Sequence, residues 1–256
     1  ALASRYRAAR RHRTRAHPAA SESVAHMPAF FVTATGTDIG KTFVTAGLIR
    51  HLRAQGLPVD ARKPVMSGFD PATAADSDAG VLLRALGRPV NEVELDRIAP
   101  WRYRAPLAPD LAAAREGRRL DVDKMIAHSN EAVARTAGTL LIEGVGGIMV
   151  PLDETRTVLD WMTALGLPVL LVTGSYLGTI SHTLTALAVL DAARLDVRAI
   201  VVCDSVGSTV ALADTVDTLR RFGRGTRGTD VIAIPRLQRP DDPHPAFADL
   251  AALVVR

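Results

Sequence analysis

Residues 29–42 read AFFVTATGTDIGKT, an apolar run followed by a loop and by the start of a segment with helical periodicity. A phosphate-binding loop needs inward backbone N–H groups, a lysine that reaches the outer phosphates, and a hydroxyl for magnesium. Lys41 and Thr42 supply the last two, although the standard spacing would place a glycine where Thr35 stands. The alternative is a capped helix with a surface lysine. The position of Gly40-Lys41-Thr42 at a strand-to-helix junction favours the phosphate loop.

Apolar runs and amphipathic segments of helical length alternate along the rest of the chain. We expect strands at residues 29–35, 59–66, 139–143, 168–173, 197–202 and 230–234. We expect helices at residues 41–55, 77–86, 122–137, 157–165, 179–194 and 209–222. Continuous apolar strands are typical of a parallel sheet that is covered on both faces. The sequence therefore predicts an α/β fold of the P-loop NTPase kind, with a mainly parallel sheet between two helical layers. Residues 91–117 are expected to form a long irregular excursion over the active face.

The composition is that of a globular protein with a basic N-terminal segment. Of the 256 residues 48% are apolar and 23% are charged, and the net charge is +4. Residues 1–26 hold six arginines and one glutamate, so the rest of the chain carries a net charge of −1. A nearly neutral body argues against nucleic-acid binding. No apolar window reaches the roughly 18 residues of a membrane helix.

Two segments are predicted from these patterns. Residues 27–256 are expected to form a single P-loop domain. Residues 1–26 are expected to form a basic, disordered extension, either an organellar transit peptide or an artefactual upstream segment.

Cysteine and lysine are both scarce. Cys203 is the single cysteine, which excludes an intramolecular disulfide and suits a reducing compartment, and we expect a cytoplasmic location. Only three of the 31 basic residues are lysine, namely Lys41, Lys63 and Lys124. A compact ammonium differs chemically from a planar guanidinium. We therefore expect the ammonium group itself to be required for function at Lys41 and Lys63, which lie inside the motifs Gly40-Lys41-Thr42 and Lys63-Pro64-Val65-Met66-Ser67-Gly68.

Two carboxylates are candidates for magnesium besides the hydroxyl of Thr42. Glu143 ends an apolar run and precedes the small-residue loop Gly144-Val145-Gly146-Gly147, which is typical of a metal-binding acid after a buried strand. The alternative is an exposed strand-end carboxylate. Asp78 is either a second ligand or a charge at a helix N-terminus.

Lys63 and Ser67 close the second predicted strand, in the segment Lys63-Pro64-Val65-Met66-Ser67-Gly68. The carboxyl ends of parallel strands form the ligand crevice in such sheets. We therefore expect both side chains beside the phosphate loop. The alternative for Lys63 is a solvated surface lysine.

Seven motifs in chain order, over residues 29–237, together resemble the dethiobiotin synthetase family. They are Thr37-Asp38-Ile39-Gly40-Lys41-Thr42, Lys63-Pro64-x-x-Ser67-Gly68, Ser77-Asp78-Ala79, Glu143-Gly144-x-Gly146-Gly147, Pro151-Leu152 with Asp160-Trp161, Leu177-Gly178-Thr179-Ile180-Ser181-His182, and Ile234-Pro235-x-Leu237. The resemblance implies a homodimeric ligase that makes dethiobiotin, ADP and phosphate from 7,8-diaminopelargonic acid, CO₂ and ATP, in biotin biosynthesis. It also implies a carbamate and a carbamoyl-phosphate mixed anhydride as intermediates.

The same resemblance implies roles for individual residues. Thr42, Asp78 and Glu143 would bind Mg²⁺. Lys63, with Lys41 and Thr37, would hold the carbamate, and Ser67 would lie near the substrate nitrogens. A helix N-terminus of the partner subunit would receive the substrate carboxylate through Gly178, Thr179, Ile180 and Ser181. The nucleotide would contact Asp38, Ile39, Gly40, Lys41, Thr42, Phe43, Asp78, Glu143, Gly144, Val145, Gly146, Cys203, Asp204, Pro235, Arg236 and Leu237. His182 is expected to be structural, because the sequence shows no proton-transfer partner for it.

Two positions depart from the family pattern. Ala34 stands where the family has an early loop glycine. Cys203 stands where the family has an asparagine that reads the adenine edge. A thiol is a weak hydrogen-bond donor and acceptor, so the sequence predicts weaker base selectivity than an asparagine would give.

Two other functions fit parts of the pattern. A synthetase domain fused to a glutaminase, as in cobyrinic acid amidation, needs about two hundred further residues and a cysteine nucleophile. A partition-type or septum-positioning ATPase switch carries a second lysine early in the loop, where this chain has Gly36. That difference favours the synthetase. Stimulation of ATP hydrolysis by DNA or lipid would favour the switch.

Overall fold

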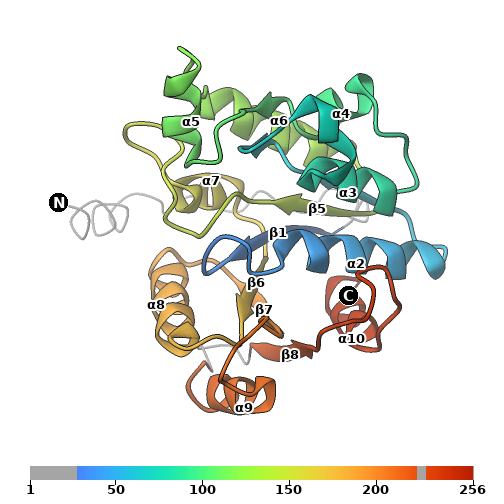
Figure 1. The fold of residues 1–256 in the computed structure, drawn as a ribbon, viewed down its shortest axis with the longest axis vertical. Helices are drawn as coiled ribbons and strands as arrows, with labels where there is room; N and C mark the ends of the chain where they lie inside the picture. The colour runs from blue at the N-terminus through green and yellow to red at the C-terminus, as the bar shows by residue number, and fades with distance from the viewer. Residues whose placement is uncertain (1–27, 224–228, 256) are drawn as a thin grey trace, which may run out of the picture.

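A single six-stranded sheet organises the computed structural model, which describes residues 28–223 and 229–255 (Figure 1). The strand order is β2-β5-β1-β6-β7-β8, and all neighbouring strands are parallel. The strands are β1 (Ala29–Ala34), β2 (Val59–Arg62), β5 (Thr139–Glu143), β6 (Val169–Gly174), β7 (Val197–Cys203) and β8 (Asp230–Ile234). The prediction of a mainly parallel α/β sheet is confirmed.

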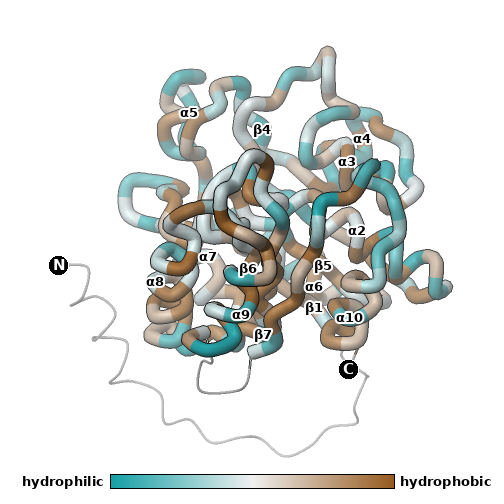
Figure 2. The backbone as a smooth tube through the Cα atoms, turned by 60° about the horizontal axis from the view of Figure 1, so that its bottom comes forward, coloured by the Kyte–Doolittle hydropathy of each residue, from teal (hydrophilic) through white to brown (hydrophobic). Residues whose placement is uncertain are grey.

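Helices cover both faces of this sheet. The longer ones are α2 (Lys41–Ala54), α3 (Asp78–Ala85), α6 (Val122–Arg135), α7 (Val158–Leu165), α8 (Thr179–Ala192), α9 (Leu212–Phe222) and α10 (Ala246–Val254). Alternate residues of β1 enter different cores: Phe30 and Val32 pack with α2, α3 and α10, while Phe31 packs with α6, α7 and α8. Hydrophobic residues gather along the central strands, and hydrophilic residues dominate the outer loops (Figure 2).

The predicted strand over residues 59–66 is wrong, because the chain breaks at Lys63-Pro64. Only β2 joins the main sheet, and β3 (Val65–Met66) pairs instead with β4 (Trp101–Arg102) in a separate two-stranded sheet. Pro64 has no N–H to give to a sheet, and the N–H of Lys63 turns to the carbonyl of Ile98 at 2.8 Å. The break directs Lys63 out of the sheet.

The excursion over residues 91–117 is more regular than predicted. It contains α4 (Glu92–Ile98), β4 and α5 (Pro109–Arg115), and the short 3₁₀ helix η1 (Pro71–Asp76) lies before it. The carboxamide oxygen of Asn91 accepts from the N–H of Glu94 at 2.9 Å and caps α4. The excursion supports the chain after β3, since the carbonyl of Tyr103 accepts from the N–H of Phe69 at 2.9 Å. It contributes no residue to the walls of the two cavities described below.

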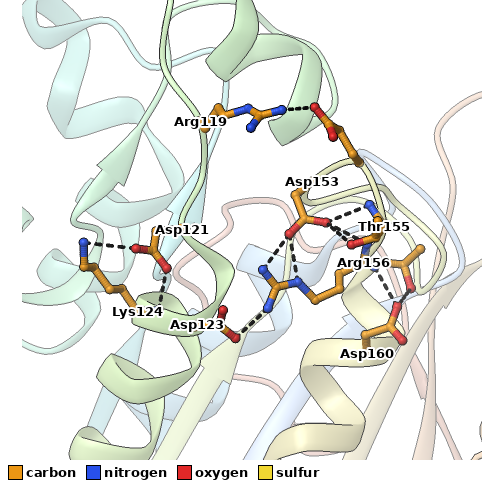
Figure 3. Close-up of polar contacts among 10 residues, drawn as sticks. Arg119, Asp121, Asp123, Lys124, Asp153, Thr155, Arg156 and Asp160 are labelled. Atoms are coloured by element: carbon orange, nitrogen blue, oxygen red, sulfur yellow. Dashed lines mark hydrogen bonds and ion pairs between the residues drawn. The ribbon is translucent and has the colours of Figure 1, made fainter.

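Ion pairs and turns fix the loop before α7 (Figure 3). Asp153 accepts from the N–H groups of Thr155 and Arg156, at 2.8 and 2.7 Å, and from the guanidinium of Arg156. Asp160 completes a capping box with Thr157 at the start of α7. Trp161 is fully buried and meets the ring of Phe31 edge-on at 4.7 Å. The motif pair Asp160-Trp161 therefore works in packing and capping.

The C-terminal helix α10 was not predicted. Its Phe247 ring lies on Gly47 of α2, where an added Cβ would stand 2.1 Å from the ring. Residues 1–26 lie outside the described part of the chain, and the division at residue 27 stays a prediction. Within the described ranges, no helix combines the length and the apolar character needed to cross a membrane.

Candidate active site

The phosphate-loop sequence connects β1 to α2 at the carboxyl edge of the sheet. Gly40 is the N-cap of α2 and has a φ of 106°, in the region that favours glycine. A Cβ at Gly40 would stand 3.1 Å from Cys203 Sγ, at the end of β7. The Nζ of Lys41 donates to the carbonyl of Gly36 at 3.1 Å. The loop thus curls over its own lysine at a helix N-terminus, a geometry that suits an anion.

A charged cluster joins the ends of two strands and the starts of two helices beside this loop. The Lys63 ammonium contacts Glu143 Oε1 at 2.7 Å, the Gly144 carbonyl at 2.8 Å and Asp78 Oδ2 at 3.0 Å. The hydroxyl of Thr42 donates to the same Glu143 Oε1 at 2.7 Å. The order β2-β5-β1 brings these residues together, because the ends of β2 and β5 lie next to the loop after β1.

Burial and charge shift the pKa values of this cluster in different directions. Burial, with repulsion from Lys63, lowers the pKa of Lys41 to about 8. Burial alone would lower the pKa of Lys63 too, but the charges of Glu143 and Asp78 outweigh it and raise that pKa above its ordinary value. The pKa of Asp78 is held below its usual range, because the charge and hydrogen bond of Lys63 outweigh its burial. Lys63 and Asp78 are therefore both charged.

The donor set fits a magnesium ion. Glu143 Oε2 is buried and has no hydrogen-bond partner, while Oε1 accepts twice. An orphaned buried carboxylate oxygen is costly unless a cation or donor meets it. No group of three His, Cys, Asp or Glu gathers anywhere in the described ranges. Magnesium is commonly bound by one or two carboxylates together with substrate phosphates. The carboxylates of Asp78 and Glu143 and the hydroxyl of Thr42 form such a ligand set.

Two cavities meet at the loop. The larger, of about 810 Å³, runs from the loop to the ends of β7 and β8. Its walls include Thr37 and nine of the sixteen residues predicted to bind the nucleotide, namely Asp38, Ile39, Gly40, Phe43, Cys203, Asp204, Pro235, Arg236 and Leu237. Burial raises the pKa of Cys203 to about 12, so its thiol stays neutral. This cavity has the place and size for a nucleoside.

The smaller cavity, of about 530 Å³, lies over the charged cluster. The residues predicted for phosphate, metal and substrate that line it are Thr37, Asp38, Gly40, Lys41, Thr42, Phe43, Lys63, Ser67, Asp78, Val145 and Gly146. Glu143 and Gly144 do not line this cavity, but both accept a hydrogen bond from the Lys63 ammonium, which does. Gly146 lies against the loop, since a Cβ there would stand 3.6 Å from Thr37 Oγ1. The arrangement can hold two adjacent anions between two ammonium groups.

Four predicted substrate residues stand apart from this group. Gly178, Thr179, Ile180 and Ser181 open α8 and line neither cavity. Their neighbour His182 does line the larger cavity, and its Nδ1 lies 2.9 Å from the hydroxyl of Tyr176. The hydroxyl of Tyr176 is thus a hydrogen-bond partner of His182 that the sequence did not indicate, and the structural role of His182 stays a prediction.

Sequence reasoning missed several wall residues of the larger cavity. Tyr176 follows β6, Ser205 and Val206 follow β7, and Gln238 follows β8. All four come within four residues of a strand's carboxyl end. The rule that ligands bind at these ends could have found them.

Comparisons with known proteins identify the family of the chain. A family model described as an AAA domain matches residues 28–240. The ATP-dependent dethiobiotin synthetase BioD of Acidiphilium cryptum is 51% identical over 196 residues, covering 76% of this chain and 88% of the relative. The protein of the same name from Phenylobacterium zucineum is 49% identical and covers 87% of this chain and 92% of the relative.

Among solved structures, the MinD cell division protein of Aquifex aeolicus has a TM-score of 0.49 at 14% identity. It covers 89% of this chain and 95% of that chain, and similarity at this level does not bear on function. The identities of 49 and 51% to the two relatives extend over most of the chain. They show that this chain belongs to the ATP-dependent dethiobiotin synthetase family.

Proposed function

We propose that the chain closes the ureido ring of dethiobiotin from 7,8-diaminopelargonic acid, CO₂ and ATP, with release of ADP and phosphate. The position of Lys63 carries the proposal: a second buried ammonium stands near Lys41, in the same cavity as Ser67. Phosphorylation of an anionic carbamate develops negative charge, which preorganised cations stabilise. The names of the relatives support the same reaction.

The proposed reaction has three steps. One amine of the substrate attacks CO₂, so that an N–C bond forms and the nitrogen loses a proton to solvent. A carbamate oxygen then attacks the γ-phosphorus of ATP, the bond to the β-phosphate oxygen breaks, and ADP leaves. The second amine attacks the carbonyl carbon of the mixed anhydride, phosphate leaves, and the ring closes with loss of a second proton.

We assign the chain's residues to these steps by charge and position. Lys63, Lys41 and Thr37 hold the carbamate, and Lys41 also binds the nucleotide phosphates. Ser67 orients the substrate nitrogens from the wall of the smaller cavity. Point ammonium charges suit this task better than planar guanidinium groups, because the cluster is compact and each ammonium has three donors.

Magnesium belongs to the proposal as the cofactor. Thr42, Asp78 and Glu143 would hold it, and the orphaned Glu143 Oε2 supports this assignment. When bound, the ion neutralises charge on the transferring phosphoryl group.

A homodimer and a cytoplasmic location complete the proposal. Gly178 and its neighbours through Ser181 line neither cavity of their own subunit. A helix N-terminus can bind a carboxylate through its free N–H groups, and we assign this turn to the substrate carboxylate in the partner's site. Dependence on ATP and the single buried cysteine agree with a reducing, ATP-supplied compartment.

The function is tested by product analysis. The protein is incubated with diaminopelargonic acid, bicarbonate and MgATP, and dethiobiotin is sought by mass spectrometry. We expect the product only when all three substrates are present. ATP hydrolysis without product, stimulated by DNA or lipid vesicles, would support the switch-type function instead.

A further inference from the structure

Lys63 has a feature that its proposed role in catalysis does not require. Its ammonium already contacts both carboxylates proposed for magnesium, Glu143 at 2.7 Å and Asp78 at 3.0 Å. The Gly144 carbonyl takes its third donor at 2.8 Å. An ammonium has three donors, so all of them are used on the metal side of the cavity.

The cluster is electrically balanced without a metal ion. Within the cluster Lys41 and Lys63 carry two positive charges, and Asp78 and Glu143 carry two negative charges, while the other two carboxylates of the cavity wall, Asp38 and Asp76, are exposed to solvent. The Lys63 side chain is 1% exposed and that of Glu143 is 0% exposed, so water screens their interaction little. A divalent cation that entered alone would leave a net charge of +2 beside the two buried ammonium groups, which is unfavourable even though the Asp78 side chain is 45% exposed on the other side of the cluster.

A nucleotide changes this balance. Its phosphates bring several negative charges to the loop next to Lys41, and they offer oxygens that a metal ion also uses. The cation and the phosphates then compensate each other, and Lys63 no longer makes the local charge excessively positive. From this geometry we propose that Lys63 makes binding of the divalent cation conditional on the nucleotide. The inference rests on the proposed metal ligands Thr42, Asp78 and Glu143.

The proposal predicts a gain of binding on removal of Lys63. Lys63→Gln keeps a donor for the Gly144 carbonyl but removes the charge, and it leaves the two carboxylates without a cation. Mn²⁺ serves as the probe, and its free concentration is followed by electron paramagnetic resonance without nucleotide or diamine. We expect Lys63→Gln to bind Mn²⁺ at least about tenfold more tightly than the wild type, a coupling of ordinary size.

A matched control comes from the third lysine. Lys124 also contacts a carboxylate, that of Asp121 at 3.0 Å, but its side chain is 77% exposed. Lys124→Gln should bind Mn²⁺ as the wild type does. Addition of a non-hydrolysable ATP analogue should tighten Mn²⁺ binding to the wild type more than to Lys63→Gln, because the variant has less charge to compensate.

A thermal measurement covers the case in which the variant is unstable. Loss of Lys63 leaves buried negative charge unpaired, which destabilises a fold. Mn²⁺ alone should therefore raise the melting temperature of Lys63→Gln and leave that of the wild type nearly unchanged. Equal nucleotide-free Mn²⁺ affinity in both proteins, or tight Mn²⁺ binding to the wild type alone, would overturn the proposal.

Glu143→Gln separates failure of this inference from failure of the metal assignment. If Glu143→Gln binds Mn²⁺ in the presence of nucleotide as tightly as the wild type does, Glu143 is not a metal ligand and the metal assignment fails. If Glu143→Gln loses Mn²⁺ binding while Lys63→Gln gains none, only the inference fails. Neither outcome depends on whether the chain makes dethiobiotin.

Discussion

The ammonium of Lys63 sits in a space built for one nitrogen with three acceptors around it. A guanidinium is larger and planar, and it cannot place its donors on those three oxygens from the same stem. Lys63→Arg should therefore lose turnover almost as fully as Lys63→Ala, by on the order of a hundredfold or more. Nucleotide affinity should stay close to that of the wild type, because Lys41 and the loop remain. Near-normal ring closure by Lys63→Ala, measured with saturating diamine, would remove Lys63 from the mechanism.

Cys203 gives a prediction about the choice of nucleotide. Its thiol is buried, neutral and packed against Gly40, at the place where the family resemblance puts adenine recognition. Sites that hydrogen-bond their substrate discriminate far more strongly than apolar ones, and a thiol bonds weakly. We expect kcat/KM for ATP to exceed that for CTP, GTP or UTP by no more than about tenfold. A strict preference for ATP that survives in Cys203→Ala would show that other groups read the base.

The sequence predicted individual site residues better than their contacts. Lys41, Thr42, Lys63, Asp78 and Glu143 were all expected at the crevice, because each lies at the end of a strand or in the first turn of a helix. The ion pair between Lys63 and Glu143 could not be predicted, since it joins residues 80 positions apart. The ion pair forms because β2 and β5 are neighbours in the sheet. No local sequence pattern predicts the order of the strands.

Helices and strands were predicted correctly where the hydrophobic periodicity agrees with the residues that signal the ends of an element. The strands Thr139–Glu143 and Asp230–Ile234 have the predicted bounds. The error at residues 59–66 came from apolar residues that continue past Pro64 into a second sheet. The helix Ala246–Val254 follows a proline-rich segment, and its place is fixed by packing on α2 rather than by a local signal.

The edge strand β2 carries a buried ion cluster that predicts acid sensitivity. Asp60 contacts Arg62 and Arg88, each at 2.8 Å, and Arg97 at 3.5 Å. Burial alone would raise the pKa of Asp60, but the charge and hydrogen bond of Arg62 lead the effects that hold it below 3.8. The unfolded carboxylate binds protons more readily, so its contribution to stability is complete above about pH 4 and is lost as the pH falls through the folded pKa.

Asp60→Asn tests that contribution. The variant should lose about 3 kcal/mol of unfolding free energy at pH 7, because Arg62 keeps its buried charge without a partner. The difference from the wild type should shrink below about pH 4. Urea unfolding at several pH values measures it. Glu154→Gln removes an exposed ion pair with Arg119 (Figure 3) and should change stability by less than about 1 kcal/mol. A difference for Asp60→Asn that does not vary with pH would refute the electrostatic cause.

At the scale of the whole molecule, the proposed dimer makes each active site depend on two chains. Ser181 is exposed at the start of α8, so Ser181→Glu should fold normally and repel the substrate carboxylate in the partner's site. Lys63→Ala disables the site of its own chain. Each variant alone should be inactive, and a mixture allowed to exchange subunits should regain activity, because one site of each mixed dimer is intact.

The mixing experiment has a clear control and a clear contradiction. Ser181→Ala adds no charge and should remain active by itself. If the mixture of Ser181→Glu and Lys63→Ala stays inactive while sedimentation shows exchanged dimers, the turn at Ser181 does not serve the partner's site.

The most direct test of the proposed reaction follows the carbon atom. With diaminopelargonic acid, MgATP and ¹³C-bicarbonate, we predict dethiobiotin that is heavier by one mass unit, with one ADP and one phosphate formed for each product molecule. Lys41→Ala should form almost none. Release of ADP at the same rate without the diamine, or a product that carries no ¹³C, would contradict ring closure through a phosphorylated carbamate.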